Sequence, residues 1–234
     1  MKKVLVIILM IVVFVSCKKE KQNTSETVPP PPDSPNTVST ATAYNGYFVS
    51  GNGGITAGFS SIPYPNLYSD TDQVKSVSCN GNLFTYHHDF LFYIGQGALN
   101  QSIETIKVVG AGSIPSFTYT NTDKAPSYSS LIIPDTISKS VGFTIKIYNV
   151  KDITPTGLEL RLQNYSGPPV VVYKPVTNGN NTITFTPSDL ASYVPGTNLD
   201  ISIILENSKV LNFYGKDFKF TKQNVFENYV RIMP

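Results

Sequence analysis

Apolar and polar side chains alternate along four runs in the second half of this 234-residue chain. The apolar positions are Val141, Phe143, Ile145 and Ile147, then Leu158, Leu160 and Leu162, then Leu199, Ile201, Ile203 and Leu205, and finally Phe226, Val230 and Ile232. Neighbouring residues of a strand point to opposite faces of a sheet, so this period of two is typical of strands with one buried face and one wet face. No long segment repeats with the helical period of about 3.6 residues. The sequence therefore predicts an all-β chain that forms an antiparallel β-sandwich.

The first half contains shorter strand segments, of which the pair around Asn80-Gly81 is the clearest. Asn-Gly supplies the two positive φ angles of a type I′ turn, so we expect a hairpin of Val74 to Cys79 with Asn82 to His87. The other expected strands are Tyr44 to Ser50, Ile55 to Ile62, Phe90 to Ile94, Thr105 to Gly110 and Pro115 to Thr120.

One short helix is expected at Pro187 to Tyr193. Thr186 is placed to cap its first turn, Pro187 takes the first helical position, and Asp189 follows three residues after the cap.

The segment Asn121 to Ser130 is rich in Asp, Lys, Pro and Ser and is expected to connect two β-rich regions. We place the first region at residues 41–124 and the second at residues 125–234. About seven strands are expected after residue 140, which is the number in an immunoglobulin-like domain and favours two such domains. The alternative is one larger sandwich whose sheets mix strands from both halves. A fold analogy of this kind carries no function.

The N-terminal segment has the three parts of a secretory signal. Lys2 and Lys3 precede twelve uninterrupted apolar residues, Val4 to Val15, after which Ser16 and Cys17 follow. As a helix, twelve residues would rise about 18 Å, which is short of the ~30 Å hydrocarbon core of a bilayer. A charged start, a short apolar core and a small final residue predict a cleaved signal peptide at residues 1–16.

Phe14-Val15-Ser16-Cys17 resembles the lipobox of bacterial lipoproteins, although Phe14 stands where leucine is usual. The resemblance implies that Cys17 becomes the new N-terminus, carries a diacylglycerol on its sulfur, and anchors the protein to a membrane. Lys18-Lys19-Glu20-Lys21 and the composition are similar to those of surface lipoproteins of the Bacteroidota. This similarity implies that the protein is anchored to the outer membrane, on either its periplasmic or its outer face. Asp135-Thr136-Ile137 resembles the short sequon at which some members of that phylum attach O-linked glycans.

Residues 17–40 are expected to form a disordered tether. They are mostly polar and contain Pro29-Pro30-Pro31-Pro32, so they cannot bury a core. Consecutive prolines favour extended polyproline II, which acts as a semi-rigid spacer of about 3.1 Å per residue.

Removal of the signal peptide changes both the charge and the cysteine count. Without Lys2 and Lys3, the 18 basic residues fall to 16, which equals the 16 acidic residues. A balanced chain lacks the basic field that a nucleic-acid partner requires, so no such partner is expected. Only two cysteines occur, and lipidation of Cys17 leaves Cys79 with no partner for an intramolecular disulfide.

The residue types that support catalysis or metal binding are sparse. His87 and His88 are the only histidines, and adjacent strand residues point to opposite faces, so we expect no metal site there. Cys79 precedes a tight turn and is expected to be a small buried residue without a base beside it. Asp70 and Asp72 lack the glycine and glutamate of a calcium loop. No phosphate-binding or nucleophile-elbow motif is present. We expect a non-enzymatic protein without a cofactor.

Two tyrosines, Tyr64 and Tyr68, lie in the segment Pro63 to Tyr68 that we expect to be a loop. Exposed aromatic rings there are the candidate ligand-binding residues, with a glycan or a protein as the ligand. The leading hypothesis is therefore a membrane-anchored surface lipoprotein that binds such a partner. The alternatives are a structural or accessory component of an envelope complex and a hydrolase with unrecognised carboxylates.

Overall fold

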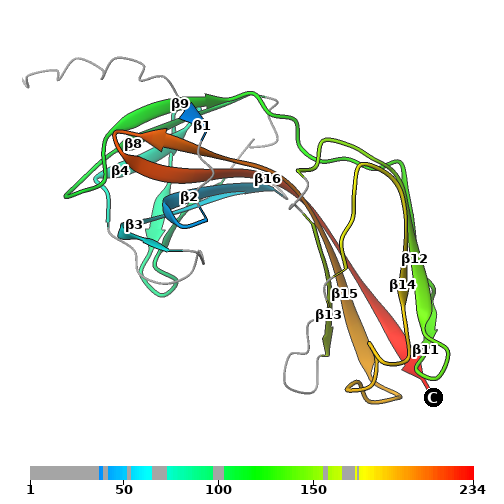
Figure 1. The fold of residues 1–234 in the computed structure, drawn as a ribbon. Helices are drawn as coiled ribbons and strands as arrows, with labels where there is room; N and C mark the ends of the chain where they lie inside the picture. The colour runs from blue at the N-terminus through cyan, green and yellow to red at the C-terminus, as the bar shows by residue number, and fades with distance from the viewer. Residues whose placement is uncertain are drawn as a thin grey trace, which may run out of the picture. The chain divides into compact units, whose positions relative to one another are not determined.

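The computed structural model describes residues 37–38, 42–51, 54–64, 73–96, 103–154, 158–164, 172 and 174–234, which all belong to the unit Asp33–Pro234. Strands and turns make up the regular structure of these residues, and none of them is helical. The strands form three sheets in which most neighbours are antiparallel (Figure 1). The prediction of an all-β sandwich with antiparallel sheets is confirmed.

The largest sheet has nine strands in the order β1-β15-β16-β2-β3-β7-β6, with β13 paired to β15 and β11 paired to β16. Its members are β1 (Thr37–Val38), β2 (Tyr44–Gly51), β3 (Gly54–Tyr64), β6 (Thr85–His87), β7 (Phe92–Gln96), β11 (Thr136–Ser138), β13 (Leu158–Asn164), β15 (Asn198–Phe213) and β16 (Lys216–Met233). Two pairs are parallel, namely β16 with β2 and β16 with β11. The last strand of the chain therefore joins strands from both halves of the sequence.

The other two sheets are smaller. A four-stranded sheet has the order β5-β4-β8-β9, and a three-stranded sheet has the order β10-β12-β14. Their members are β4 (Ser76–Cys79), β5 (Asn82–Leu83), β8 (Glu104–Val109), β9 (Phe117–Asn121), β10 (Ser130–Ile132), β12 (Phe143–Val150) and β14 (Gly179–Phe185).

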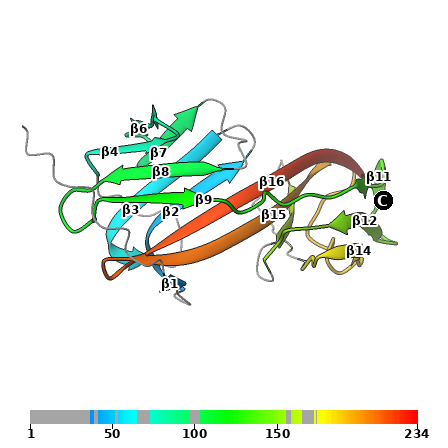
Figure 2. The same cartoon turned by 90° about the horizontal axis from the view of Figure 1, so that it is seen from above.

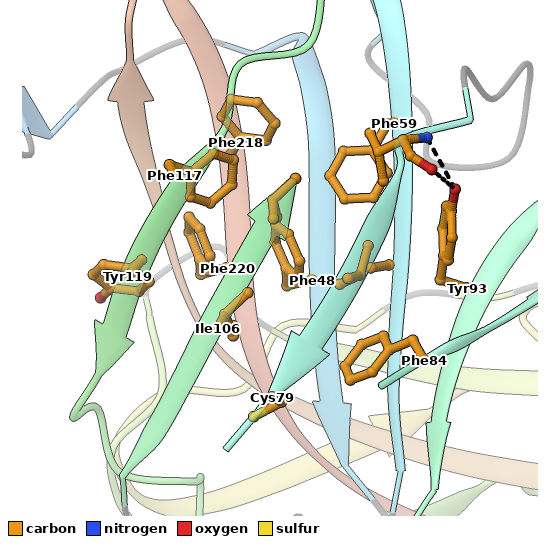
Figure 3. Packing of buried hydrophobic residues seen from close by; sticks show 14 of the residues in the cluster. Phe48, Phe59, Cys79, Phe84, Tyr93, Ile106, Phe117, Tyr119, Phe218 and Phe220 are labelled. Atoms are coloured by element: carbon orange, nitrogen blue, oxygen red, sulfur yellow. Dashed lines mark hydrogen bonds between the residues drawn. The ribbon is translucent and has the colours of Figure 1, made fainter. Parts of the chain in front are cut away.

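The Asn80-Gly81 hairpin forms as predicted, but its second strand is shorter than expected. Asn80 and Gly81 have φ angles of 49° and 83°, and Cys79 pairs with Asn82 across the turn. The chain then leaves this sheet at Phe84, which is buried, and β6 continues in the large sheet. Phe84 anchors this crossing because its ring fills the core between the two sheets (Figure 3).

The expected helix at Pro187 to Tyr193 is wrong, although its capping residues interact as predicted. The Thr186 amide donates to Asp189 Oδ2 at 2.9 Å, and the Asp189 amide donates to Thr186 Oγ1 at 3.4 Å. The backbone that follows closes successive turns through bonds to the third residue back, from Leu190 to Pro187 and from Tyr193 to Leu190. A segment of seven residues is too short to offset the cost of nucleating a helix. Burial of Leu190 and Tyr193 holds it instead.

An aromatic core fills the space between the four-stranded sheet and the facing part of the large sheet. Phe48 and Phe220 stack with ring centroids 4.9 Å apart, and Tyr119 lies 4.5 Å from Phe220 (Figure 3). The Tyr93 hydroxyl accepts a bond from the amide of Val74 and donates one to its carbonyl, both at 2.9 Å. We call this cluster the first core.

A second core is mostly aliphatic and lies between the three-stranded sheet and β11, β15 and β16. Phe143 and Phe185 stack at 4.6 Å, while the fully buried members include Ile137, Ile145, Ile147, Leu199, Ile201, Leu205 and Ile232. The alternating runs of the sequence predict much of this core, because most of their described apolar positions belong to it. Val141 is the exception, since it is 77% exposed.

The β15–β16 hairpin supplies residues to both cores from one of its faces. These strands pair without interruption from Asn198↔Arg231 to Phe213↔Lys216, and Figures 1 and 2 show them side by side. At one end the face carries members of the second core, and at the other end it carries Leu211, Phe213, Phe218 and Phe220. Between them it carries only polar side chains, which we call the polar belt: Asn207, Lys209, Lys222 and Asn224.

The polar belt fixes the connection that the sequence placed at Asn121 to Ser130. Asn207 Nδ2 donates to the Lys124 carbonyl at 2.9 Å, and Asn224 Nδ2 donates to the Pro126 carbonyl at 3.2 Å. Lys209 Nζ lies 2.7 Å from Asp123 Oδ2. These contacts satisfy backbone carbonyls of a segment that forms no sheet pairing there. The division into domains at 41–124 and 125–234 stays a prediction.

Candidate binding surface at the end of strand β3

A wide bulge displaces the end of β3 from its neighbour β2. Gly46 pairs with Phe59, and Tyr44 pairs with Tyr64. Between these pairs β2 has one residue, Asn45, whereas β3 has Ser60 to Pro63. Extra residues in one strand of a pair bend that strand and re-aim its side chains. Ile62 is consequently directed outward and is 62% exposed.

Buried and charged side chains hold this bulge in place. Asn45 is only 3% exposed, and its Nδ2 donates to the carbonyls of Ser60 at 3.2 Å and Ser61 at 3.3 Å. Its Oδ1 accepts from the Asp217 amide at 3.3 Å, which ties the bulge to β16. Lys216 Nζ also donates to the Ser61 carbonyl at 3.4 Å. The exposed segment is therefore supported by hydrogen bonds at its base.

The tip of the β15–β16 hairpin lies beside this bulge and presents a tyrosine. Tyr214 and Gly215 have φ angles of 53° and 79°, which are the two positive values of a type I′ turn. Asn212 closes the turn by accepting from the Gly215 amide at 3.0 Å and donating to Asp217 Oδ1 at 2.9 Å. Tyr214 is 50% exposed. A bulky residue with positive φ is a conformational outlier that costs about 1–3 kcal/mol.

We call Ile62, Tyr214, Lys216 and the end of β3 at Tyr64 the bulge–tip surface. The Lys216–Ser61 bond joins its two parts, since Lys216 follows the hairpin tip and Ser61 precedes Ile62. An exposed aromatic ring, an exposed aliphatic side chain and an ammonium group on these two adjoining segments suit a ligand with both apolar faces and hydrogen-bonding groups.

The residues that the sequence predicted for ligand binding are only partly described. Tyr64 is the last residue of β3, so its backbone borders the bulge–tip surface. Tyr68 lies outside the described residues, as do Cys17, the signal peptide and most of the tether. The binding role of Tyr64 and Tyr68 and the lipidation of Cys17 stay predictions.

Cys79 is placed as a core residue. It is fully buried, and its neighbours in the first core include Ile106 and Phe84 (Figure 3). Burial, reinforced by the Glu104 carboxylate, raises the pKa of the Cys79 thiol to about 11. Since the thiolate is the nucleophilic form, this cysteine is poorly suited to attack a substrate at neutral pH.

The two histidines lie at the end of β6 and in the turn that follows. His88 packs edge-on against Tyr86, with ring centroids 4.8 Å apart. Across the described parts of the chain, no group of three or more His, Cys, Asp or Glu residues is arranged to hold a metal ion. Asp70 and Asp72, the weak calcium candidates, lie outside those parts.

The glycosylation-like sequon occupies the start of β11. Asp135 and Thr136 are exposed, whereas Ile137 is fully buried in the second core. In the folded protein the hydroxyl of this sequon, on Thr136, therefore lies at the surface, while the aliphatic Ile137 lies in the core.

Sequence reasoning missed Tyr214 and Ile62. A Tyr-Gly pair between two long alternating runs was the available signal for the hairpin tip. Type I′ turns favour Asn-Gly, so a tyrosine at this position does not suggest a turn. Ile62 was assigned to a regular strand because sequence periodicity does not reveal a bulge.

In the part of the chain that the structure covers, no helix has the length and apolarity to cross a bilayer. The chain matches no protein-family model, and no curated protein with which it was compared matches its sequence.

Proposed function

We propose that this protein is a membrane-anchored surface lipoprotein that binds a glycan or protein partner through the bulge–tip surface, without catalysis. The observation that carries the binding role is Tyr214, a half-exposed aromatic residue with a φ of 53°. A strained residue persists only where the surrounding structure enforces it, and such residues cluster at functional sites. The anchor rests on the Lys2 to Cys17 segment and its lipobox resemblance.

We further propose an immunoglobulin-like type for the strands of the second core. Three strands, β10, β12 and β14, face four, β13, β15, β16 and β11, and the pair β11–β16 is parallel. Seven strands in a three-against-four sandwich support this assignment. Such sandwiches present their loops and hairpin tips at the ends of the sheets, and this suits a binding protein.

Replacing Tyr214 by asparagine tests the binding role. Asparagine tolerates the left-handed conformation, so the Tyr214→Asn variant should fold at least as stably as the wild type. Loss of a central aromatic contact should weaken binding about tenfold or more, which corresponds to about 1.4 kcal/mol. A glycan array and a cross-linking pull-down from cell envelopes would supply the ligand, and titration calorimetry would measure the affinity.

Tyr229→Asn is the matched control because Tyr229 is a comparably exposed tyrosine of β16, at 56%, away from the hairpin tip. Its affinity should equal that of the wild type. Equal affinities for the Tyr214 variant and the wild type would remove this residue from the binding surface.

The anchor is tested by Cys17→Ser. This variant lacks the sulfur that receives the lipid, so it should stay unlipidated and keep its signal segment. Fractionation, with mass spectrometry of the N-terminal peptide, measures both properties. A cleaved Cys17→Ser protein that still partitions into membranes would contradict the lipobox assignment.

A further inference from the structure

Three buried polar side chains lie where the first core adjoins the polar belt, to which Lys222 belongs. Glu104, Asn121 and Lys222 are 2%, 3% and 3% exposed. Lys222 Nζ lies 3.8 Å from Glu104 Oε1. An amine, a carboxyl group and a carboxamide so far from water are unusual, because burying polar groups is costly. The bulge–tip surface includes none of them.

The strand register brings these three residues together. Glu104 and Asn121 are direct cross-strand partners in the β8–β9 pair, and both point into the core. Side chains of such partners are neighbours on one face of the sheet. Glu104 therefore lies next to Asn121 and close to Lys222.

Aromatic contacts between the two sheets show that β9 and β16 run past each other in register toward Asn121 and Lys222. Phe117 lies 4.8 Å from Phe218, and two residues further along each strand Tyr119 lies 4.5 Å from Phe220 (Figure 3). The next inward positions of β9 and β16 are Asn121 and Lys222.

We propose that Lys222 and Asn121 form an intramolecular amide bond, with Glu104 as the proton-transferring group. Lys222 Nζ attacks Cγ of the Asn121 carboxamide, the new Nζ–Cγ bond forms, the Cγ–Nδ2 bond breaks, and Nδ2 leaves as ammonia. The product is a cross-link between β9 and β16, and no oxidant or reductant is needed.

The protons balance through Glu104. The ammonium of Lys222 first gives a proton to the Glu104 carboxylate, which leaves a neutral nucleophilic amine and a neutral acid. After attack, the nitrogen of Lys222 loses a second proton while Nδ2 gains one, so that ammonia can depart. Glu104, which is a neutral acid at this stage, gives its proton to Nδ2 and takes the proton of Lys222 on its other oxygen, so it ends as the neutral acid. Conversion of the buried ion pair to two neutral groups also removes the cost of two buried charges.

Two features of the site favour these steps. Burial raises the pKa of the Glu104 carboxyl group, despite the opposing effects of Lys222 and Ser50, so this residue holds a proton more readily than an exposed glutamate. The amide of Asp123 donates to Asn121 Oδ1 at 3.1 Å. This bond polarises the carboxamide and stabilises the charge that develops on its oxygen during attack.

Peptide mapping of the denatured wild-type protein tests the proposal directly. Trypsin should fail to cleave after Lys222, and a branched peptide containing Lys222 and Asn121 should appear. Its mass should equal the sum of the masses of the two linear peptides minus the mass of one ammonia molecule. Glu104→Gln and Lys222→Met should yield only linear peptides, with Asn121 intact. Circular dichroism verifies that each variant is folded.

Lys209→Met is the control, since Lys209 carries its ammonium in the neighbouring, partly exposed pair with Asp123. The branched peptide should persist in that variant. Complete cleavage after Lys222 in the folded wild-type protein, with a linear Asn121 peptide, would overturn the proposal. That measurement needs no variant and so decides the question even if a substitution prevents folding.

Discussion

Replacing Phe220 by alanine should lower the free energy of unfolding by about 3–5 kcal/mol, the range for removing a buried phenylalanine ring. Phe220 is 1% exposed. Its ring stacks on Phe48 at 4.9 Å, with an interplanar angle of 5°, and contacts Tyr119 at 4.5 Å. Truncation would leave a cavity in the middle of the first core. Rings fixed in strands on both sides prevent that cavity from collapsing, so the loss should lie toward the upper end of the range.

Equilibrium unfolding in urea measures this change, provided that the slope of the transition is unaltered. Phe90→Ala is the control because Phe90 is 65% exposed, and its removal should change the stability by no more than about 0.5 kcal/mol. Similar midpoints for the two variants would show that the first core does not govern unfolding. An unchanged midpoint for Phe220→Ala would contradict the packing in Figure 3.

Replacing Gly142 by alanine should be severely destabilising, by more than about 4 kcal/mol. Gly142 has a φ of 84°, and an added Cβ would lie 2.2 Å from the carbonyl oxygen of Phe185. That oxygen belongs to a strand residue whose ring is fully buried and stacked on Phe143. Neither the turn nor the strand can move without breaking pairing between β12 and β14.

Gly112→Ala separates the effect of the positive φ angle from the effect of the steric clash. Gly112 also has a positive φ, 58°, but an added Cβ would meet no atom within 4 Å. The free energy of unfolding of this variant should fall only by the conformational cost of a left-handed alanine, about 1–2 kcal/mol. Thermal unfolding of both variants measures the difference. Equal losses of stability in the two variants would mean that the positive φ alone causes the effect and that the Phe185 carbonyl moves to make room for the added Cβ.

Local patterns in the sequence predicted most strands but not their partners. The period of two located β12, β13, β15 and β16, and Asn80-Gly81 located the β4–β5 turn, because both signals depend on nearby residues only. The parallel pairing of β16 with β2 joins residues far apart in sequence, for example Phe218 with Gly46. Periodicity says which face of a strand is buried, and several partners can satisfy the same face.

The sites were predictable to a smaller extent. Tyr64 was found because it stands among prolines, but the placement of Tyr214 beside the β3 bulge depends on tertiary contacts such as that of Lys216 with Ser61. Lys222 breaks an apolar series after Phe218 and Phe220, so the sequence marks it as an exception. Only the structure shows that Glu104 lies 3.8 Å from it and that Asn121 is the cross-strand partner of Glu104.

Because both cores share the β15–β16 hairpin, neither core can be completed before that hairpin has been synthesised. Residues of β15 and β16 complete both cores, and these strands follow all the other described strands in the sequence. At about 5–20 residues per second, Ile145 is synthesised about 3–11 s before Leu199, and Phe48 about 9–34 s before Phe220. Until then, much of the apolar surface of β2, β8 and β12 stays accessible to chaperones. Arrival of a single hairpin then allows both cores to close together.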